Sequence, residues 1–229
     1  DLWAGAYAAE LQDDIAGIKR TLGRINLSPL GSAAGYGTPN VPVDRQFTAD
    51  ALDFDKVHEP VTAVQLSRGK AEASLVFELS LLMQDLGRLA SDLLLFYTQE
   101  FAFISLPDNI TTGSSIMPQK RNPDVLELVR AASATMQGSL VEIMSITAKL
   151  PSGYQRDLQR IKSPLFKAID LAQDSALIMT NLVNGLSFNA ENIVLDPSVH
   201  AAADANKMVV EEGISFRDAY RRVGEAYKK

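Results

Sequence analysis

Apolar residues recur at alternating steps of three and four over four long stretches of this sequence. This spacing gathers them on one stripe of an α-helix, and a repeat of about 3.5 residues makes long helices pack side by side at shallow angles. The pattern predicts an all-α fold, a long-helix bundle rather than a compact globin-like arrangement. The four stripes are Leu11, Ile15, Ile18, Leu22 and Ile25; Leu75, Leu79, Leu82, Leu86, Leu89, Leu93 and Phe96; Val129, Ala132, Met136, Ser139, Ile143, Ile146 and Leu150; and Leu165, Ile169, Ala172, Ala176, Met179, Val183 and Leu186.

The second stretch also carries apolar residues outside its stripe, among them Val76, Phe77, Met83 and Leu94. A helix with a single buried stripe would leave these side chains in water, which is unfavourable for large apolar groups. We therefore expect more than one flank of the long helices to be covered, and this expectation favours an oligomer.

Three loops rich in Gly, Pro or Ser interrupt the helical pattern, at residues 27–50, 105–122 and 151–164. After Gly185 the pattern changes to short helices: one is predicted to begin at Asp196-Pro197 and end at Gly213, and Ser215 opens the next. The sequence thus predicts a central helical-bundle domain, 1–186, followed by a small α-helical C-terminal subdomain, 187–229. No alternating pattern predicts a strand.

The overall composition excludes several classes of protein. Hydrophobic residues make up 46% and charged residues 22% of the chain, which is usual for a globular protein. The net charge is −6 and no run of Lys or Arg exceeds two residues, so no nucleic-acid-binding surface is expected. Cys is absent, so disulfides and thiolate chemistry are excluded. Charges interrupt each apolar stretch before the roughly 20 residues that a membrane span requires, and no signal peptide is visible; we expect a cytoplasmic protein.

The densest chemical signal lies between residues 112 and 124. Gly113 and two serines predict a mobile loop that presents hydroxyl groups, and Lys120 adds a positive charge for a carboxylate or a developing oxyanion. Asn122, followed by Pro and Asp, is predicted to cap the next helix, whose N-terminus would favour an anion. The residues alone leave two interpretations open: a carboxylate-binding site, or an ordinary Gly-Ser loop with a solvated lysine and a capped helix.

The segment Gly-Ser-Ser-x-Met-Pro-x-Lys-x-Asn resembles the signature of the fumarase/aspartase superfamily, whose members cleave a C–N or C–O bond β to a carboxylate and release fumarate or a relative of it. The resemblance implies that Ser114 is the catalytic serine, with either Ser114 or a partner His as the base. It implies that Lys120 and Asn122 stabilise the aci-carboxylate carbanion, that Ser115 binds substrate, and that Glu127 orients the catalytic His.

Within the superfamily the sequence is most similar to the argininosuccinate lyases. Gln119 gives the loop the form that this family has, and Pro29-Leu30-Gly31 followed by Asp44-Arg45 is similar to another family segment. Residues 150–162 resemble its second substrate motif. The resemblance implies that Tyr154, Gln159 and Lys162 hold the substrate carboxylates and amine, and places Arg45 near the site. The alternative for residues 150–162 is an ordinary connection between helices.

Neither of the two histidines, His58 and His200, matches the catalytic one, which in this family lies in a Thr-His-x-Gln-like segment shortly upstream of the position that Asp1 matches. The resemblance therefore implies about half of a complete lyase, its C-terminal part, with the other half upstream or in a separate chain. It also implies a homotetramer with composite active sites from three subunits, argininosuccinate as substrate, and no metal or organic cofactor. We expect the chain on its own to be inactive.

Two further functions stay open. The chain could belong to another fumarate-releasing lyase of the superfamily, or to a structural, crystallin-like helical bundle without activity. Gln119 and the spacing of Tyr154, Gln159 and Lys162 argue against the first. The presence of Ser114 in an intact loop argues against the second.

Overall fold

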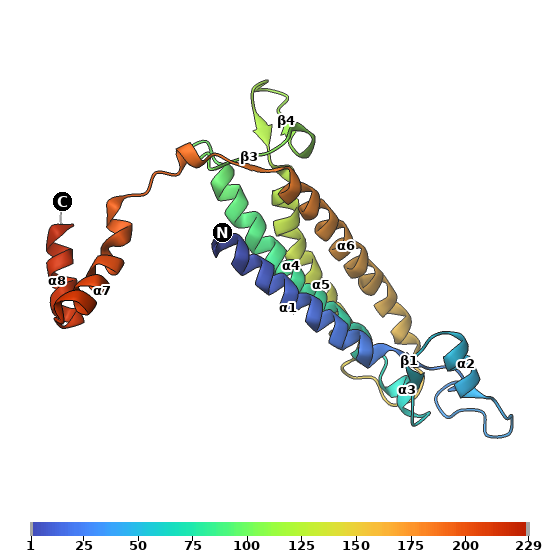
Figure 1. Cartoon of the computed structure of the whole chain (residues 1–229). Coiled ribbons are helices and arrows are strands. Elements are labelled where there is room, and N and C mark those ends of the chain that lie inside the picture. Colours follow the sequence, from blue (N-terminus) through green and yellow to red (C-terminus); the bar gives the residue numbers. More distant parts are fainter. Residues whose placement is uncertain (1, 228–229) are drawn as a thin grey trace.

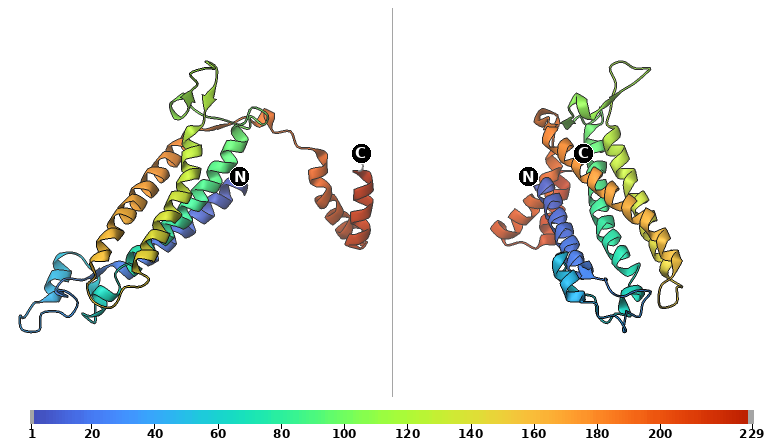
Figure 2. Two further views of the ribbon diagram at one scale, coloured as in Figure 1. Left: turned by 180° about the vertical axis from the view of Figure 1, so that it is seen from behind. Right: turned by 90° about the vertical axis from the view of Figure 1, so that its right-hand side faces the viewer.

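The computed structural model describes residues 2–227 and is dominated by four long helices that lie side by side (Figure 1). Successive long helices run in opposite directions along the bundle (Figure 2). The predicted all-α fold built on a long-helix bundle is confirmed. The long helices are α1 (Leu2–Ile25), α4 (Lys70–Tyr97), α5 (Asp124–Thr147) and α6 (Lys162–Gly185).

Helix α4 is the central element of the bundle, because it packs against α1, α5 and α6. Its stripe residues Leu79, Leu86 and Leu93 are buried, and so are Val76 and Met83 on the neighbouring flank. Burial of each such side chain contributes about 1.5–3 kcal/mol, so both flanks of α4 support the fold. The expectation of a second covered flank is thus confirmed for Val76 and Met83, whereas Phe77 stays half exposed in the single chain.

The predicted stripe of α1 is only partly correct. Ile15 and Leu22 are about half exposed, whereas Asp14, Gly17 and Thr21 are the residues that α1 buries. Small residues let two helices approach closely, and a Cβ at position 17 would overlap the carboxylate of Glu78 on α4. The face that α1 turns toward α4 therefore combines these residues with Trp3, Tyr7, Leu11 and Ile18, which pack against the core.

Asp14 is the unusual member of this buried face. Only 6% of its surface is exposed, and its Oδ2 atom has no hydrogen-bond partner among the residues described. Burial, followed by the nearby carboxylates of Asp85 and Asp13, raises the pKa of Asp14 to about 6. The interface between α1 and α4 thus contains a carboxyl group that favours its neutral form.

Short paired strands join the loops at both ends of the bundle, although no alternating pattern in the sequence predicts a strand. Each strand has two residues, too few to produce an alternating pattern in a sequence. They pair as β1 (Leu27–Ser28) with β2 (Lys56–Val57) in parallel, and as β3 (Ile104–Ser105) with β6 (Ser187–Phe188) and β4 (Thr112–Gly113) with β5 (Arg121–Asn122) in antiparallel fashion.

The remaining helical elements are short and lie outside the long-helix bundle. Helices α2 and α3 and the 3-10 helix η2 lie at the end of the bundle where α1 ends and α4 begins (Figure 1). None of the helices in the part of the chain that the structure describes is long and apolar enough to cross a membrane. Their bounds are α2 (Arg45–Ala51), α3 (Ala63–Leu66), η1 (Asp108–Ile110), η2 (Arg156–Ile161), η3 (Ala190–Asn192) and η4 (Pro197–His200).

The last two helices, α7 (Ala201–Glu212) and α8 (Phe216–Ala226), form a hairpin that lies apart from the bundle (Figures 1 and 2). The predicted helix signals are confirmed: Gly213 ends α7 with a φ of 68°, and the Ser215 hydroxyl caps α8 by accepting from the backbone of Asp218. The hairpin has a small core of its own, made of Ala205, Ala219 and Val223. An independent subdomain over residues 187–229 stays a prediction.

Candidate active site

The Gly-Ser loop projects from one end of the bundle as a short hairpin (Figure 1). Strands β4 and β5 pair Thr112 with Asn122 and Gly113 with Arg121. The hydroxyl of Thr112 donates to Oδ2 of Asp124 at the start of α5, so the base of the hairpin is fastened to this helix. No sequence pattern indicates this contact. It depends on the pairing of β4 with β5, and strands of two residues are too short to give a recognisable pattern.

Two further contacts hold the base of the hairpin. The hydroxyl of Tyr97, the last residue of α4, donates to the backbone carbonyl of Arg121 at 3.4 Å. The guanidinium of Arg121 lies 3.5 Å from a carboxylate oxygen of Asp108. This ion pair is largely exposed, so its contribution to stability is small, within about 1 kcal/mol.

Ser114 lies at the first position of the hairpin tip. Its Oγ atom accepts hydrogen bonds from the backbone N–H groups of Ile116 at 3.2 Å and Met117 at 3.1 Å. Bonds of this kind form a serine-headed turn, and they also place two donors where negative charge on the oxygen would be stabilised. The geometry is therefore suited to a serine that carries or shares a negative charge.

The rest of the tip is open to solvent. Met117 accepts a hydrogen bond from the backbone of Lys120 at 3.0 Å, which closes a turn. Ser115 and Lys120 are exposed, and the Ile116 side chain is 86% exposed. In the described part of the chain no acidic group pairs with the Lys120 ammonium, which leaves this cation available to a carboxylate ligand.

Asn122 does not cap α5, so this part of the prediction is wrong. Its backbone belongs to β5, and the residue at the cap position is Pro123, which offers no side-chain hydrogen bond. Pairing with Thr112 across the hairpin holds Asn122 in extended backbone, one residue too early for the cap. Glu127 follows in the first turn of α5, with its side chain exposed.

The second predicted motif occupies the connection between α5 and α6. Gln159, in η2, donates from its side-chain amide to the hydroxyl of Tyr154 at 3.3 Å. The backbone N–H of Tyr154 donates to the carbonyl of Ala34, which ties this connection to the long loop after α1. Lys162 is the first residue of α6 and is exposed, so the structure brings these three predicted residues to one end of the bundle.

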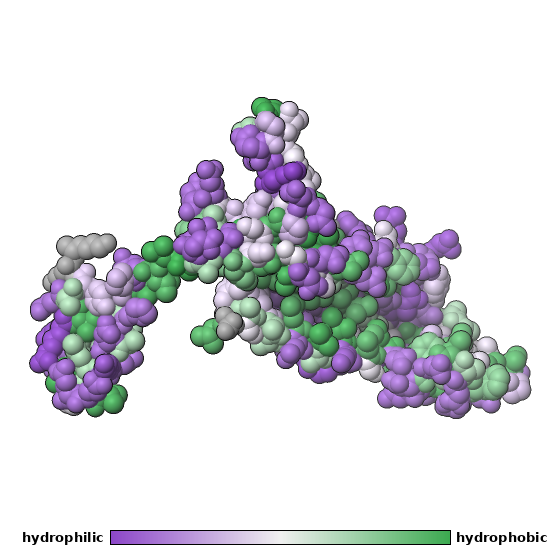
Figure 3. All heavy atoms as spheres, turned by 45° about the horizontal axis from the view of Figure 1, so that its top comes forward, coloured by the Kyte–Doolittle hydropathy of each residue, from purple (hydrophilic) through white to green (hydrophobic). Residues whose placement is uncertain are grey.

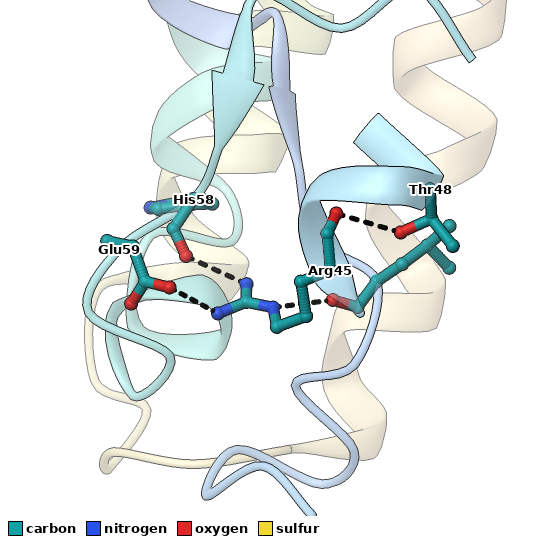
Figure 4. Close-up of polar contacts among 5 residues, drawn as sticks. Arg45, Thr48, His58 and Glu59 are labelled. Carbon is teal, nitrogen blue, oxygen red and sulfur yellow. Dashed lines mark hydrogen bonds and ion pairs between the residues drawn. The ribbon is translucent and has the colours of Figure 1, made fainter. Parts of the chain in front are cut away.

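Arg45 lies at this same end, at the start of α2, but its guanidinium is engaged within the chain (Figure 4). It donates to the carbonyls of Leu30 at 2.8 Å and His58 at 2.9 Å, and forms a 2.8 Å ion pair with Glu59. Its side chain is only 15% exposed. These contacts give Arg45 the geometry of a residue that fixes the fold of residues 30–59.

The two groups of predicted site residues lie at opposite ends of the bundle. The group with Ser114 precedes α5, and the group with Tyr154 follows it. Helix α5 has 24 residues and is therefore about 36 Å long at 1.5 Å per residue. A single copy of the chain cannot bring both groups to one substrate molecule.

The two histidines stand away from the hairpin. His58 follows β2 at the opposite end of the bundle, and His200 ends η4 beside the C-terminal hairpin. Across residues 2–227, no group of three or more His, Asp or Glu side chains is arranged to hold a metal ion. A histidine partner for Ser114 is therefore not found near it within the described chain.

Residues 2–138 match a family model described as lyase, and the chain belongs to this lyase family, part of the fumarase/aspartase superfamily. Its relatives include argininosuccinate lyases: it is 42% identical over 226 residues to that of Bacteroides thetaiotaomicron and 45% identical over 223 residues to that of Sorangium cellulosum. These matches cover 97% and 96% of the chain. The chain spans about half the length of these relatives, 50% and 51%.

Solved structures have the same fold. An EDDS lyase in complex with formate superposes with a TM-score of 0.79 at 28% identity, over 96% of this chain and 44% of that one. A class II fumarase from Schistosoma mansoni superposes with a TM-score of 0.77 at 18% identity, over 96% of this chain and 54% of that one. The second likeness concerns the fold alone.

Proposed function

We propose that this chain forms part of an argininosuccinate lyase, which splits argininosuccinate into arginine and fumarate. In this β-elimination a base removes a proton from the succinyl carbon that bears one carboxylate. The C–N bond of the neighbouring carbon then breaks, and its electron pair stays with the arginine nitrogen. The observation that carries the proposal is the exposed hairpin tip. There Ser114 accepts two backbone hydrogen bonds, and Lys120 of the same tip pairs with no acidic group of residues 2–227. The proposed reaction uses no metal or organic cofactor, and the proposed location is the cytoplasm.

Each residue of the hairpin has a role in this proposal. Ser114 takes the proton, and the N–H groups of Ile116 and Met117 stabilise its negative form. Lys120 and Asn122 stabilise the extra charge that the substrate carboxylate gains in the transition state. Ser115 binds the substrate, and Glu127 orients a histidine that another segment or chain supplies.

The substrate-binding motif of the proposed site comes from a different copy of the chain. Tyr154, Gln159 and Lys162 would hold the remaining carboxylates and the amine. They follow α5, whereas Ser114 precedes this helix of 24 residues, which is about 36 Å long. Two copies packed in opposite directions would bring the ends together. This arrangement supports a composite active site in a homotetramer, and a separate chain could supply the missing histidine.

Apolar surface on the flanks of the bundle supports the same assembly. Large side chains remain exposed on α5 and α6, among them Leu128, Val141, Met144, Phe166 and Leu177. Figure 3 shows that apolar atoms gather along the side of the bundle. Surfaces of this kind usually mark interfaces, so we propose that further copies of the chain cover them.

The experiment is a fumarate-release assay, followed by ultraviolet absorbance, on the complete protein that contains this chain. Argininosuccinate, adenylosuccinate, malate and EDDS are supplied side by side. We expect turnover of argininosuccinate alone, and its loss by a factor of about a thousand or more in Ser114→Ala. Ser145→Ala, an exposed serine on α5, is the matched control and should retain full activity.

Any other result of this assay would support one of two alternative functions. Preference for adenylosuccinate, malate or EDDS would assign the chain to another lyase of the superfamily. No turnover of any substrate by a tetrameric, folded protein would favour a structural, crystallin-like role. We expect the 229-residue chain assayed by itself to be inactive, because no described histidine lies beside the hairpin.

A further inference from the structure

A cavity of about 410 Å³ lies between the end of α1, the short helix α3 and the first turn of α4. Much of its lining is apolar and comes from Ile25, Leu27, Val64 and Leu66. Three cations, Arg24, Arg68 and Lys70, line it as well. A pocket that combines an apolar lining with a few charged groups is typical of small-molecule sites.

The three cations stand between this cavity and a second one. The second has a volume of about 700 Å³, lies toward the end of α5, and is lined by Arg24, Arg68 and Lys70 too. These three cations therefore lie close together, with Glu72 lining the first cavity and Glu78 the second.

Hydrogen bonds hold Arg24 at this place. Its guanidinium donates to the hydroxyl of Ser74 at 3.2 Å, and this hydroxyl donates to the carbonyl of Lys70 at 2.8 Å. Neither Arg24 nor Lys70 forms an ion pair with any described carboxylate, whereas Arg68 lies 3.3 Å from Glu72. Glu72 lines the cavity too but is paired with Arg68, so Arg24 and Lys70 are the two lining cations that have no ion-pair partner among the described residues.

An anion in this cavity would contact side chains, not the backbone N–H of Gly69 before α4. Glu72 already accepts a hydrogen bond from the backbone N–H of Gly69 at 2.6 Å. The opposite wall is firmly built: the backbone of His58, another lining residue, donates to Ser28 at 3.0 Å and accepts from Arg45 at 2.9 Å. Figure 4 shows the His58 ring pointing away from Arg45.

We propose that this cavity is a binding site for a small carboxylate that carries a short apolar chain. Arg24 and Lys70 pair with the carboxylate, and the apolar chain lies against Leu27, Val64 and Leu66. The site is distinct from the proposed active site, because neither the hairpin nor the residues around Tyr154 line it. Its ligand is therefore an additional one.

Helix α3 links this site to the second substrate motif. Ala63 and Leu66 line the cavity on one side, and on the other they line a hollow of about 240 Å³ together with Ser152 and Gly153. Gly153 directly precedes Tyr154 in the chain. A ligand in the cavity would thus be separated by helix α3 from the segment that precedes Tyr154.

The test is isothermal titration of the full 229-residue chain at low ionic strength with three probes: hexanoate, hexanol and inorganic phosphate. We expect hexanoate to bind once per chain, and hexanol and phosphate to bind about tenfold more weakly, because each has only one of the two required features. Added salt should weaken the binding of hexanoate.

Three variants locate the site. Arg24→Gln with Lys70→Gln should weaken hexanoate binding by about tenfold or more, and Ala71→Leu should block the cavity by filling it. Lys19→Gln, an exposed cation of α1 outside the cavity, should bind as the parent chain does. Circular dichroism of each variant checks that the helices are intact.

Two results would overturn the proposal. One is unchanged hexanoate binding in both the double variant and Ala71→Leu while their helices are intact. The other is loss of binding in Lys162→Gln, because that would place the carboxylate in the second substrate motif. Failure of the lyase assay would leave this titration unaffected, so the two proposals are tested independently.

Discussion

The indole N–H of Trp3 donates a hydrogen bond to Oδ2 of Asp92 at 2.8 Å, and the hydroxyl of Tyr7 donates to the same oxygen at 2.8 Å. These bonds fasten the first two turns of α1 to the second half of α4. The Trp3 ring also packs on Tyr7 and Phe96, with centroids 5.4 and 5.3 Å apart. Burial and the bond to Asp92 raise the pKa of Tyr7 to about 12, so this donor keeps its proton at ordinary pH.

Asp92→Ala should therefore loosen the start of α1. The change leaves two partly buried donors without an acceptor, at a cost of about 1–3 kcal/mol in the free energy of unfolding. Chemical denaturation measures the loss, and hydrogen exchange should show it concentrated in residues 3–11. Asp170→Ala, an exposed acid on α6, is the control; an equal loss there would contradict the assignment.

Asp14→Asn should make the chain less sensitive to pH. The folded-state pKa of Asp14, about 6, lies above the value near 3.8 of an unperturbed carboxyl, so the folded state prefers the proton. Stability from this group is complete below pH 3.8 and is lost as the pH rises through 6, with a maximal cost of about 3 kcal/mol above that.

The amide cannot ionise, so Asp14→Asn should be more stable than the parent chain at about pH 8 and no more stable at about pH 4. Denaturation at both pH values measures the difference. The groups that face Asp14 are Asp85 and Glu78 on α4 and Asp13 and Glu10 on its own helix. Asp13→Asn is the control, and an equal effect there would show that net charge, not burial, is responsible.

Gly69 and Gly213 allow a matched comparison, because both have a positive φ, 86° and 68°. A Cβ at Gly69 would overlap the side chain of Thr147, whereas nothing lies within 4 Å of one at Gly213. Gly213→Ala should cost about 1 kcal/mol from backbone strain alone. Gly69→Ala should cost about 3 kcal/mol, because overlap is added; equal thermal shifts would refute the role of Thr147.

Arg45→Lys should not replace the arginine. A lysine ammonium cannot match the planar fork that reaches the carbonyls of Leu30 and His58 and the Glu59 carboxylate together. We expect faster proteolysis within residues 30–59 while the helical signal of the bundle is unchanged. Arg156→Lys, an exposed arginine of η2, should be cleaved at the parent rate.

Val141→Lys combined with Met144→Lys should reduce the oligomer to smaller species. These side chains are 62% and 56% exposed on α5, so the change adds charge to a surface that we propose is covered by another copy. Light scattering coupled to size exclusion measures the mass. Glu142→Lys on the same helix adds charge without removing apolar surface and should preserve the assembly. An unchanged mass of the double variant would exclude this surface from the interface.

The helical repeat predicts the architecture well but not which face each helix buries. On α4 the stripe is right because large side chains fill the centre of the bundle. On α1 it misses Asp14 and Gly17, because an apolar pattern counts neither a carboxylic acid nor a glycine as a buried residue. The presence of a long helix is thus well predicted by its periodic sequence, whereas the buried face of a helix at the edge of the bundle is not.

Motifs predicted the candidate site residues, but not their distribution in space. The spacing from Ser114 to Asn122 identifies one loop, yet its hairpin form depends on the pairing of Thr112 with Asn122 and on the contact of Thr112 with Asp124. These contacts cross between short segments that have no sequence pattern of their own. Resemblance places Arg45 near the site, and its three internal partners emerge only in the folded chain.

The separation of Ser114 and Tyr154 by the length of α5 has a genetic consequence. In the proposed assembly each active site takes its residues from different chains, so a defective chain contributes its defective residues to more than one site. A chain damaged only at the hairpin and a chain damaged only at the other end should therefore complement each other. In a mixed oligomer both defects can lie in the same site, and a neighbouring site then contains only unaltered residues. Two inactive proteins should therefore regain activity when they assemble together.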